Sequence, residues 1–194
     1  MMKSKLLIFL LTVCLAFNVF GQRIEVFKLP DIVSGTEFNL SEHQNAKAVV
    51  MVFTSLSCPF SKLYEDRISE LQRVYAPEGF VFVLIHPQVG QDEDQEDAIR
   101  AKAIQEKWDM PFLNDSKQEI TRQLKITKLP EVVVAVPSPT GFALAYRGAI
   151  DNNPQMASNA NIRYLDSALQ AIQNRRNPSP ASSRPVGCNI RTGF

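Results

Sequence analysis

One cysteine lies at the point where an apolar run gives way to an amphipathic pattern. Cys58 follows residues 49–54, a β-branched run of the length expected for a strand buried on both faces. After Pro59, apolar residues recur at steps of three and four, and charged residues occupy the positions between them. The apolar positions are Phe60, Leu63, Tyr64, Ile68, Leu71, Val74 and Tyr75. The sequence therefore predicts that Cys58 lies at the junction of a strand and a helix.

This position has consequences for the thiol of Cys58. The first turn of a helix presents unpaired N–H groups and the positive end of the helix dipole to whatever lies there. Pro59 is compatible with that turn, because the N–H it lacks would have had no helical partner. Such surroundings lower the pKa of a cysteine from about 8.5 into a range of roughly 3.5 to 7.5. We expect Cys58 to be nucleophilic near neutral pH.

Two segments resemble a known family. The predicted strand, the motif Cys-Pro-x-Ser at residues 58–61 and the predicted helix resemble the active site of thioredoxin-like proteins. The similarity is strongest to the exported thiol-disulfide oxidoreductases of the TlpA-like and AhpC-TSA (redoxin) branch. The second segment is Lys-Leu-Pro-Glu-Val-Val-Val at residues 128–134, where a proline precedes a strand. The resemblance makes Cys58 the attacking cysteine and Pro130 the cis-proline that packs beside it.

The resemblance covers about residues 48–172 and implies a fold. It predicts an α/β thioredoxin-like domain in which helices flank a central mixed sheet. The apolar runs that supply further strands are 80–85, 131–136 and 142–147, and residues 162–172 form a final amphipathic helix. A narrower group of exported members ends in Pro-Val-Gly-Cys, as residues 185–188 do here. That group also shares the motifs that run here from Cys58 to Arg67 and from Tyr146 to Asp151.

The first 21 residues have the pattern of a secretory signal peptide. Lys3 and Lys5 precede an apolar run that ends at Phe20, and this run is too short to span a bilayer easily. Val19 and Gly21 are acceptable residues before a cleavage site at Gln22. We expect an exported protein, periplasmic or secreted, with no stable membrane span after cleavage; a retained anchor is the alternative.

Charge and composition exclude several kinds of partner. The whole chain has a formal net charge of +1, and two of its lysines lie in the predicted signal peptide. No nucleic-acid partner or anionic membrane surface is implied. The acidic run 92–97 lacks the glycine and the terminal glutamate of a calcium-binding loop, and acids at a helix start need no metal. We predict no metal and no cofactor.

The cysteines define the expected domain organisation. After cleavage only Cys58 and Cys188 remain. Disulfides persist in the oxidising compartments to which such proteins are exported. Residues 22–176 are expected to form one thioredoxin-like domain, and residues 177–194 a flexible tail that carries Cys188. The tail is rich in proline and serine, which predicts no packed element. We expect the two cysteines to be partners at some stage.

The sequence departs from the usual Cys-x-x-Cys motif. Ser61 replaces the resolving cysteine; its hydroxyl can donate a hydrogen bond to a thiolate but cannot form a disulfide. A mixed disulfide at Cys58 would have to be released by an external thiol or by Cys188. The proton-transfer group is not defined. His86 follows the predicted strand 80–85 and is either a proton carrier or a strand-end residue bonded to backbone.

Three functions remain open at this point. The first is thiol-disulfide exchange with protein thiols or disulfides, in which Cys58 attacks, Cys188 resolves, and Ser61 and Pro130 frame the site. The second is a peroxiredoxin-like thiol peroxidase, whose Pro-x-x-x-Thr-x-x-Cys pattern is met here only by serine at Ser55. The third is a non-catalytic binding module in which Cys58 and Cys188 form a structural disulfide.

Overall fold

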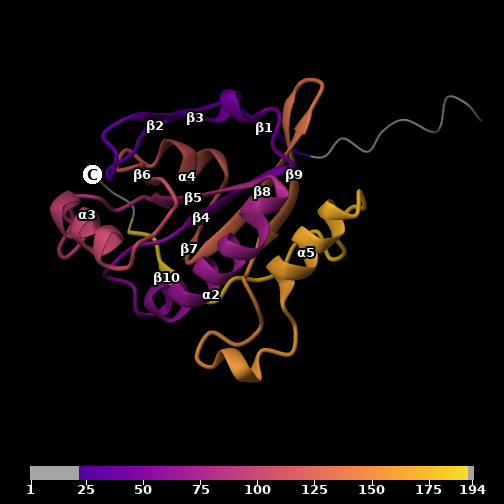
Figure 1. Cartoon of the computed structure of the whole chain (residues 1–194). Coiled ribbons are helices and arrows are strands. Elements are labelled where there is room, and N and C mark those ends of the chain that lie inside the picture. The colour runs from indigo at the N-terminus through magenta and orange to yellow at the C-terminus, as the bar shows by residue number, and fades with distance from the viewer. Residues whose placement is uncertain (1–21, 192–194) are drawn as a thin grey trace, which may run out of the picture.

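A six-stranded sheet forms the centre of the molecule. The computed structural model describes residues 22–191, and its main sheet has the strand order β1-β9-β8-β4-β5-β6 (Figure 1). The strands of this sheet are β1 (Arg23–Ile24), β4 (Ala48–Phe53), β5 (Phe80–His86), β6 (Phe112–Asn114), β8 (Glu131–Ser138) and β9 (Gly141–Gly148). The predicted signal peptide lies outside the described residues.

The sheet is mixed because of how its central strand is connected. β4 pairs in parallel with β5, which it reaches through a helix, and antiparallel with β8. β8 and β9 form an antiparallel hairpin. Every residue of β4 is buried, since this strand has neighbours on both edges and layers on both faces. The strand predicted over residues 49–54 is confirmed within one residue at each end.

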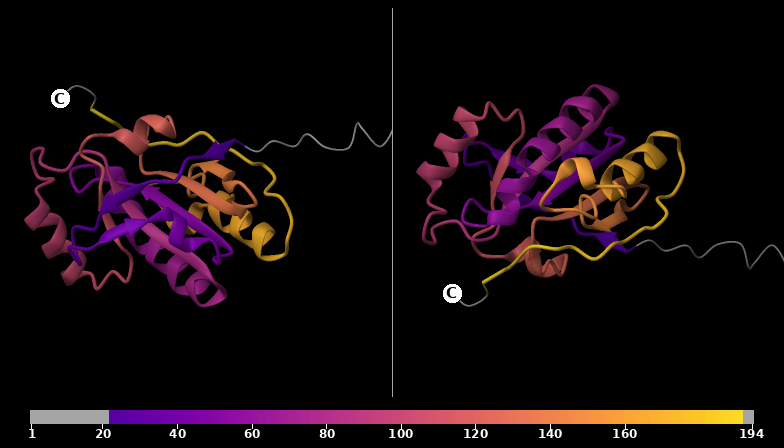
Figure 2. Two further views of the ribbon diagram at one scale, coloured as in Figure 1. Left: turned by 90° about the horizontal axis from the view of Figure 1, so that it is seen from above. Right: turned by 90° about the horizontal axis from the view of Figure 1, so that it is seen from below.

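Helices and a hairpin cover the two faces of the sheet. The helices are α2 (Pro59–Tyr75), α3 (Glu96–Gln105), α4 (Glu119–Gln123) and α5 (Tyr164–Gln173), with short 3-10 turns η1 (Leu40–His43), η2 (Ala76–Glu78) and η3 (Ala157–Asn159). Buried residues of α2, α3 and α5 pack with one face of the sheet in one core cluster. α4 and the hairpin of β2 (Lys28–Pro30) with β3 (Glu37–Asn39) pack against the other face (Figure 2). The predicted arrangement, a central mixed sheet flanked by helices, is confirmed.

The C-terminal segment lies along the domain rather than away from it (Figure 2). Ser182 pairs with Arg147 at the end of β9, and β10 (Cys188–Asn189) pairs antiparallel with β7 (Lys128–Leu129). The composition of the tail suggested no packed element, yet its last described part is a short strand. That strand exists because β7 offers it a free edge.

Candidate active site around Cys58

Cys58 occupies the N-cap of helix α2. Its backbone is extended, with φ −86° and ψ 115°, and its carbonyl accepts the first helical hydrogen bond from the amide of Lys62 at 3.2 Å. Pro59 is the first residue of the helix. The buried strand β4 ends at Phe53, so four residues of turn carry the chain from the sheet to this cysteine. Only 2% of the residue's surface is exposed.

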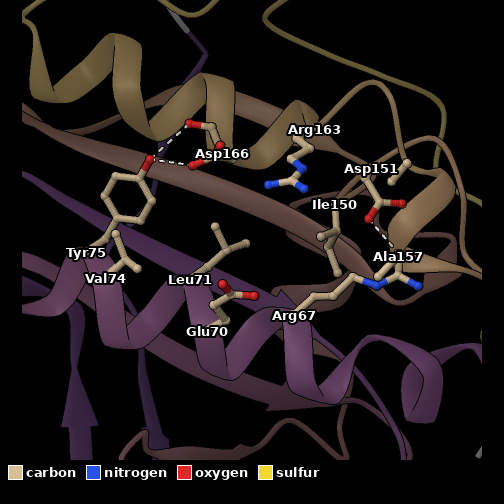
Figure 3. Close-up of a pocket in the computed structure, with 11 residues that line it drawn as sticks. Arg67, Glu70, Leu71, Val74, Tyr75, Ile150, Asp151, Ala157, Arg163 and Asp166 are labelled. Atoms are coloured by element: carbon tan, nitrogen blue, oxygen red, sulfur yellow. Dashed lines mark hydrogen bonds and ion pairs between the residues drawn. The ribbon is translucent and has the colours of Figure 1, made fainter.

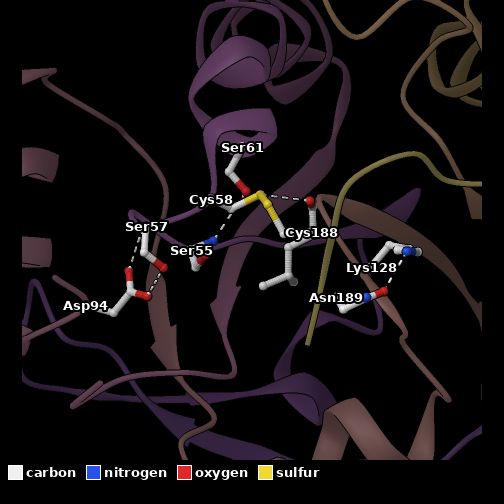
Figure 4. The surroundings of a disulfide bond; sticks show 9 residues. Ser55, Ser57, Cys58, Ser61, Asp94, Lys128, Cys188 and Asn189 are labelled. Atoms are coloured by element: carbon white, nitrogen blue, oxygen red, sulfur yellow. Dashed lines mark hydrogen bonds between the residues drawn. A yellow bond between two sulfur atoms is a disulfide. The ribbon is translucent and has the colours of Figure 1, made fainter. Parts of the chain in front are cut away.

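Cys58 and Cys188 form a disulfide. The two sulfurs are 2.05 Å apart, and the cysteines are separated by 130 positions in the chain (Figure 4). The register of β10 on β7 places Cys188 opposite Leu129. The tail therefore brings its cysteine to Cys58 as part of a two-stranded ladder.

The residues before the β8 strand form the other wall of the site. The Leu129–Pro130 peptide bond is cis, as the family resemblance implies for this proline. The carbonyl oxygen of Leu129 lies 3.1 Å from Sγ of Cys58. A disulfide sulfur carries no hydrogen, so in the oxidised protein this is a close contact. In the reduced protein the same carbonyl is placed to accept a hydrogen bond from the thiol.

A buried carboxylate stabilises this wall, and no motif in the sequence identifies it. Oε2 of Glu131 accepts hydrogen bonds from the amides of Thr127 at 3.1 Å and Lys128 at 3.4 Å. Its Oε1 accepts a hydrogen bond from Nε of Arg147 at 2.9 Å. Glu131 is almost fully buried and directly follows Pro130. The charge pair thus fixes the segment that faces Cys58.

A second buried carboxylate holds the turn on the other side of Cys58. Asp94 accepts hydrogen bonds from the amide of Ser57 at 3.0 Å and from its hydroxyl at 2.6 Å (Figure 4). Its Oδ1 is also 3.0 Å from Nε2 of His86. The amide of Gln88 donates to Nδ1 of His86, so the ring hydrogen lies on Nε2 and is donated to Asp94.

The electrostatics of Asp94 follow from these contacts. Burial opposes the charged carboxylate, but the hydrogen bonds from His86 and Ser57 outweigh it and hold the pKa of Asp94 below its usual value. His86 is therefore a buried structural partner of Asp94 as well as a strand-end residue bonded to backbone. The acidic run 92–97 is typical of a helix start, and nothing in its pattern distinguishes Asp94 as a buried partner of Ser57 and His86.

Two serines lie close to the sulfur of Cys58 (Figure 4). Oγ of Ser61 is buried and accepts a hydrogen bond from the amide of Ser55 at 3.4 Å, which ties the turn to the first helical turn. Oγ of Ser55 is buried and has no hydrogen-bond partner among residues 22–191. A buried hydroxyl is costly without a hydrogen-bond partner, so a water molecule or another polar group is the expected partner of Ser55.

A cavity of about 450 Å³ opens beside the disulfide. Its walls include both cysteines, Ser55 and the loop after β5, where Asp92 lies. Arg191 on the tail forms an ion pair with Asp92 across this cavity. The arrangement provides a polar opening to a buried sulfur pair, which suits attack by a second thiol or binding of a small oxidant.

The comparisons with known proteins agree with this fold. A family model described as thioredoxin-like matches residues 45–138. An uncharacterized conserved protein from Geobacillus kaustophilus is 22% identical, with a TM-score of 0.81 over 92% of this chain and 94% of the other. A hypothetical protein from Sinorhizobium meliloti is 24% identical, with a TM-score of 0.79 over 90% and 94%. The chain has a thioredoxin-like fold.

A third solved structure shows how far the shared fold extends. A thiol:disulfide interchange protein of the thioredoxin family from Chlorobium tepidum is 18% identical and has a TM-score of 0.54. The match covers 66% of this chain and 85% of the other chain. At these identities the likeness establishes the fold alone. No curated protein matches the sequence.

The C-terminal tail is anchored to the domain before it reaches Cys58. The Ser183 hydroxyl accepts a hydrogen bond from the amide of Ala149 at 2.9 Å and lies 2.6 Å from the hydroxyl of Tyr146. Tyr146 donates its own hydrogen to the carbonyl of Ala149, so Ser183 donates to Tyr146. Burial raises the pKa of Tyr146 to about 12, and its hydroxyl keeps that hydrogen at neutral pH. Gly148 has φ +139°, and a Cβ there would lie 2.1 Å from the carbonyl oxygen of Ser183.

The two motifs noted in the sequence between Cys58 and Arg67 and between Tyr146 and Asp151 meet in space. Nη1 of Arg67 lies 2.6 Å from Oδ2 of Asp151, and only 13% and 5% of the two side chains are exposed. Tyr64 donates to the same carboxylate at 2.9 Å. Burial and this hydrogen bond raise the pKa of Tyr64. The motifs therefore fasten α2 to the segment after β9, which positions the helix that Cys58 begins.

A second cavity, of about 280 Å³, lies next to this ion pair (Figure 3). It is lined by apolar side chains such as Leu71 and Ile150 and by charged ones such as Glu70 and Arg163. Neither cysteine lines it.

The described part of the chain has neither a candidate metal site nor a helix that could span a membrane. Residues 22–191 contain no group of three or more His, Cys, Asp or Glu side chains placed to hold a metal ion. None of the helices within that range is long and apolar enough to cross a membrane.

Proposed function

We propose that this protein is an exported thiol-disulfide oxidoreductase in which Cys58 is the nucleophile and Cys188 the resolving partner. The observation that carries the proposal is the disulfide between a helix N-cap cysteine and the one other cysteine of residues 22–194. Its substrates are protein thiols or disulfides, with an external thiol as reductant. Export rests on the signal-peptide pattern of residues 1–21, with the periplasm or the exterior as destination.

The reaction is a pair of thiol-disulfide exchanges. The Cys58 thiolate attacks one sulfur of a substrate disulfide, forms a mixed disulfide and releases the other substrate sulfur as a thiolate. The Cys188 thiolate then attacks Sγ of Cys58, and the second substrate sulfur leaves. The substrate is reduced by two electrons, the Cys58–Cys188 pair is oxidised by two, and two molecules of external thiol restore the dithiol.

Opposing influences act on the thiol of Cys58. The unpaired N–H groups of the first turn of α2 stabilise the thiolate. The carbonyl of Leu129, 3.1 Å away, favours the protonated thiol. Several N–H dipoles act against one carbonyl, so we expect the thiolate to be favoured overall. Ser61 and Pro130 complete the surroundings of the sulfur, as the resemblance implies.

Alkylation of the reduced protein across pH tests this proposal. The Cys188→Ser variant reports Cys58 alone, and the Cys58→Ser variant reports the tail cysteine as a matched reference. The expected result is an apparent pKa for Cys58 below the value of about 8.5 for a free thiol, and below that of Cys188. Equal values for the two cysteines would rule out an activated nucleophile.

Thiol peroxidase activity is a second candidate, and Ser55 favours it. Its buried hydroxyl has no partner among the described residues and lines the cavity beside Cys58, where a peroxide oxygen could accept its hydrogen. Stopped-flow mixing of the reduced protein with hydrogen peroxide separates the two activities. The reference is the rate at which hydrogen peroxide oxidises Cys188 in the Cys58→Ser variant. If Cys58 is oxidised no faster than this, peroxidase activity is excluded.

A non-catalytic module is the third candidate, because Cys58 is almost completely buried. In that case the disulfide is a permanent cross-link and not a working pair. The midpoint of the couple in glutathione buffers distinguishes them: a potential below about −300 mV identifies a structural disulfide, and a higher one a redox pair.

A further inference from the structure

The tail docks beside Cys58 in a register that is set by backbone pairing with β7 as well as by the disulfide. Cys188 lies opposite Leu129 and Asn189 opposite Lys128 in an antiparallel ladder. The ladder continues with a hydrogen bond from the amide of Ile190 to the carbonyl of Thr127 at 3.4 Å. An extended peptide whose cysteine is joined to Cys58 in this register must place its neighbouring residues at the same positions along β7.

The residue before the cysteine has no room for a side chain. A Cβ added to Gly187 would lie 2.0 Å from the carbonyl oxygen and 2.6 Å from the carbonyl carbon of Leu129. Real Cβ atoms essentially never come within 3.0 Å of such neighbours. Both atoms belong to the backbone, so they cannot move away by a rotamer change as a side chain would. The segment that contains them is also held by hydrogen bonds from the amides of Thr127 and Lys128 to Glu131. Any residue but glycine would push the strand off β7.

The residues after the cysteine alternate as in any strand. Cys188 and Ile190 pack against the apolar cluster that contains Cys58 and Leu129. Asn189 points to the exposed side, where it accepts a hydrogen bond from Nζ of Lys128 at 2.6 Å. The inner face of the site therefore takes an aliphatic side chain two positions after the cysteine.

We propose that the edge of β7 selects polypeptide partners in which glycine immediately precedes the cysteine and an aliphatic residue follows two positions after it. The tail of the protein is one such segment. The limit is set by the backbone of residues 127–131 and not by the tail, so it applies equally to a segment of another protein. This selectivity rests on the proposed function, in which Cys58 attacks a sulfur of that partner.

Synthetic peptide disulfides test the selectivity. The probes are Arg-Pro-Val-Gly-Cys-Asn-Ile with its cysteine joined to thionitrobenzoate, the same peptide with alanine for glycine, and the same peptide with aspartate for isoleucine. The full chain carrying Gly187→Ala and Cys188→Ser is used, because Cys188→Ser removes the competing thiol and Gly187→Ala is expected to weaken docking of the tail on β7. The Cys58 thiolate attacks the peptide sulfur, the peptide–aryl disulfide breaks, and the coloured aryl thiolate leaves with the electron pair. Cys58 gives up its proton to the buffer beforehand.

Two controls separate intrinsic reactivity from recognition. Each peptide is also treated with glutathione, a free thiol without a binding site, and the protein rates are divided by these. The protein is also treated with the symmetrical aryl disulfide, which needs no peptide groove. After correction, the glycine peptide is expected to react at least about tenfold faster than the alanine and aspartate peptides.

The outcomes separate the two proposals. Rapid reaction with the aryl disulfide and equal corrected rates for the three peptides would overturn the selectivity and leave the proposed function standing. If Cys58 reacts with the aryl disulfide no faster than glutathione does, the proposed function itself is overturned.

The protein with both cysteines provides a second measurement. Gly187→Ala is expected to raise the ratio of open to closed Cys58–Cys188 disulfide about tenfold at a fixed glutathione potential. Val186→Ala is the matched control, because Val186 is 52% exposed. Equal ratios in the two variants would also contradict the steric limit at position 187.

Discussion

The hydroxyl of Ser57 donates a 2.6 Å hydrogen bond to Oδ2 of Asp94, 37 positions further along the chain. Ser57 immediately precedes the cysteine that begins α2, so this contact ties the reactive turn to the loop between β5 and α3. Asp94 also accepts hydrogen bonds from the amide of Ser57 and from His86. The turn that presents Cys58 thus depends on a carboxylate that is distant in sequence.

Replacing that carboxylate should destabilise the protein in a pH-dependent way. Asp94→Asn directs an amide NH₂ toward groups that donate, and we expect the free energy of unfolding to fall by about 1–3 kcal/mol at pH 7. The pKa of Asp94 is lowered by folding, so its contribution is present above the unfolded value of 3.8 and is lost as pH falls through the lower folded value. The difference between the variant and the natural protein should therefore shrink at pH 3.

Urea unfolding followed by the fluorescence of Trp108, the single tryptophan, measures this difference. Glu93→Gln is the matched control, because it removes one negative charge from an exposed neighbour whose nearest partner, Lys62, is 3.9 Å away. A loss of stability that is equal for both variants, or that persists undiminished at pH 3, would contradict the role of the Asp94 carboxylate.

Ser183 should control how firmly the tail is held. Ser183→Ala removes the groups that satisfy the amide of Ala149 and the hydroxyl of Tyr146, and we expect a loss of about 1–2 kcal/mol. A tail released at this anchor should also give up the Cys58–Cys188 disulfide more readily, with roughly a tenfold shift in the glutathione equilibrium.

The neighbouring serine offers the control for the tail. Ser182 is exposed, and Ser182→Ala should leave both the unfolding free energy and the disulfide equilibrium within error. If Ser183→Ala behaves like Ser182→Ala in the disulfide equilibrium, the anchor does not influence the cysteine pair.

Loss of the disulfide should have a large effect on stability because the loop it closes is long. With 130 positions between the cysteines, the chain-entropy model gives about 5 kcal/mol. Cys188→Ser should therefore unfold at a much lower urea concentration than the oxidised protein and at nearly the same concentration as the reduced natural chain. A variant as stable as the oxidised protein would show that the cross-link does not restrict the unfolded state.

The ion pair between Arg67 and Asp151 should be stabilising as a pair. Arg67→Met leaves a carboxylate almost fully buried without its cation, and we expect a cost of about 3–5 kcal/mol. Adding Asp151→Asn should recover part of this loss, which a double-mutant cycle measures as a coupling energy.

An exposed pair serves as the comparison. Lys28 and Glu37 are 2.9 Å apart but both are 58% exposed, so Lys28→Met should lower the free energy of unfolding far less than Arg67→Met does. Additive effects of the Arg67 and Asp151 replacements would show that the two side chains act independently.

The elements of the fold were predictable because their signals are local. The apolar run 49–54 and the apolar positions after Pro59 identify β4 and α2, and the structure confirms both. The apolar runs 131–136 and 142–147 likewise predicted two strands, and the structure pairs them as the hairpin of β8 and β9. Cys58 could be placed at a helix start from sequence because a helix terminus is defined by its immediate neighbours. The roles of Ser61 and Pro130 remain predictions.

Local sequence patterns were therefore enough to predict the fold class and the cysteine after a buried strand, since periodicity and turn chemistry depend on neighbours in the chain. The burial of Asp94 and Glu131 beside the site and the short strand in a proline- and serine-rich tail depend instead on contacts between distant segments. A carboxylate in an acidic run looks solvated until distant donors surround it. A short strand has no stability of its own, and it forms here because the free edge of β7 and the sulfur of Cys58 lie where the tail can reach them.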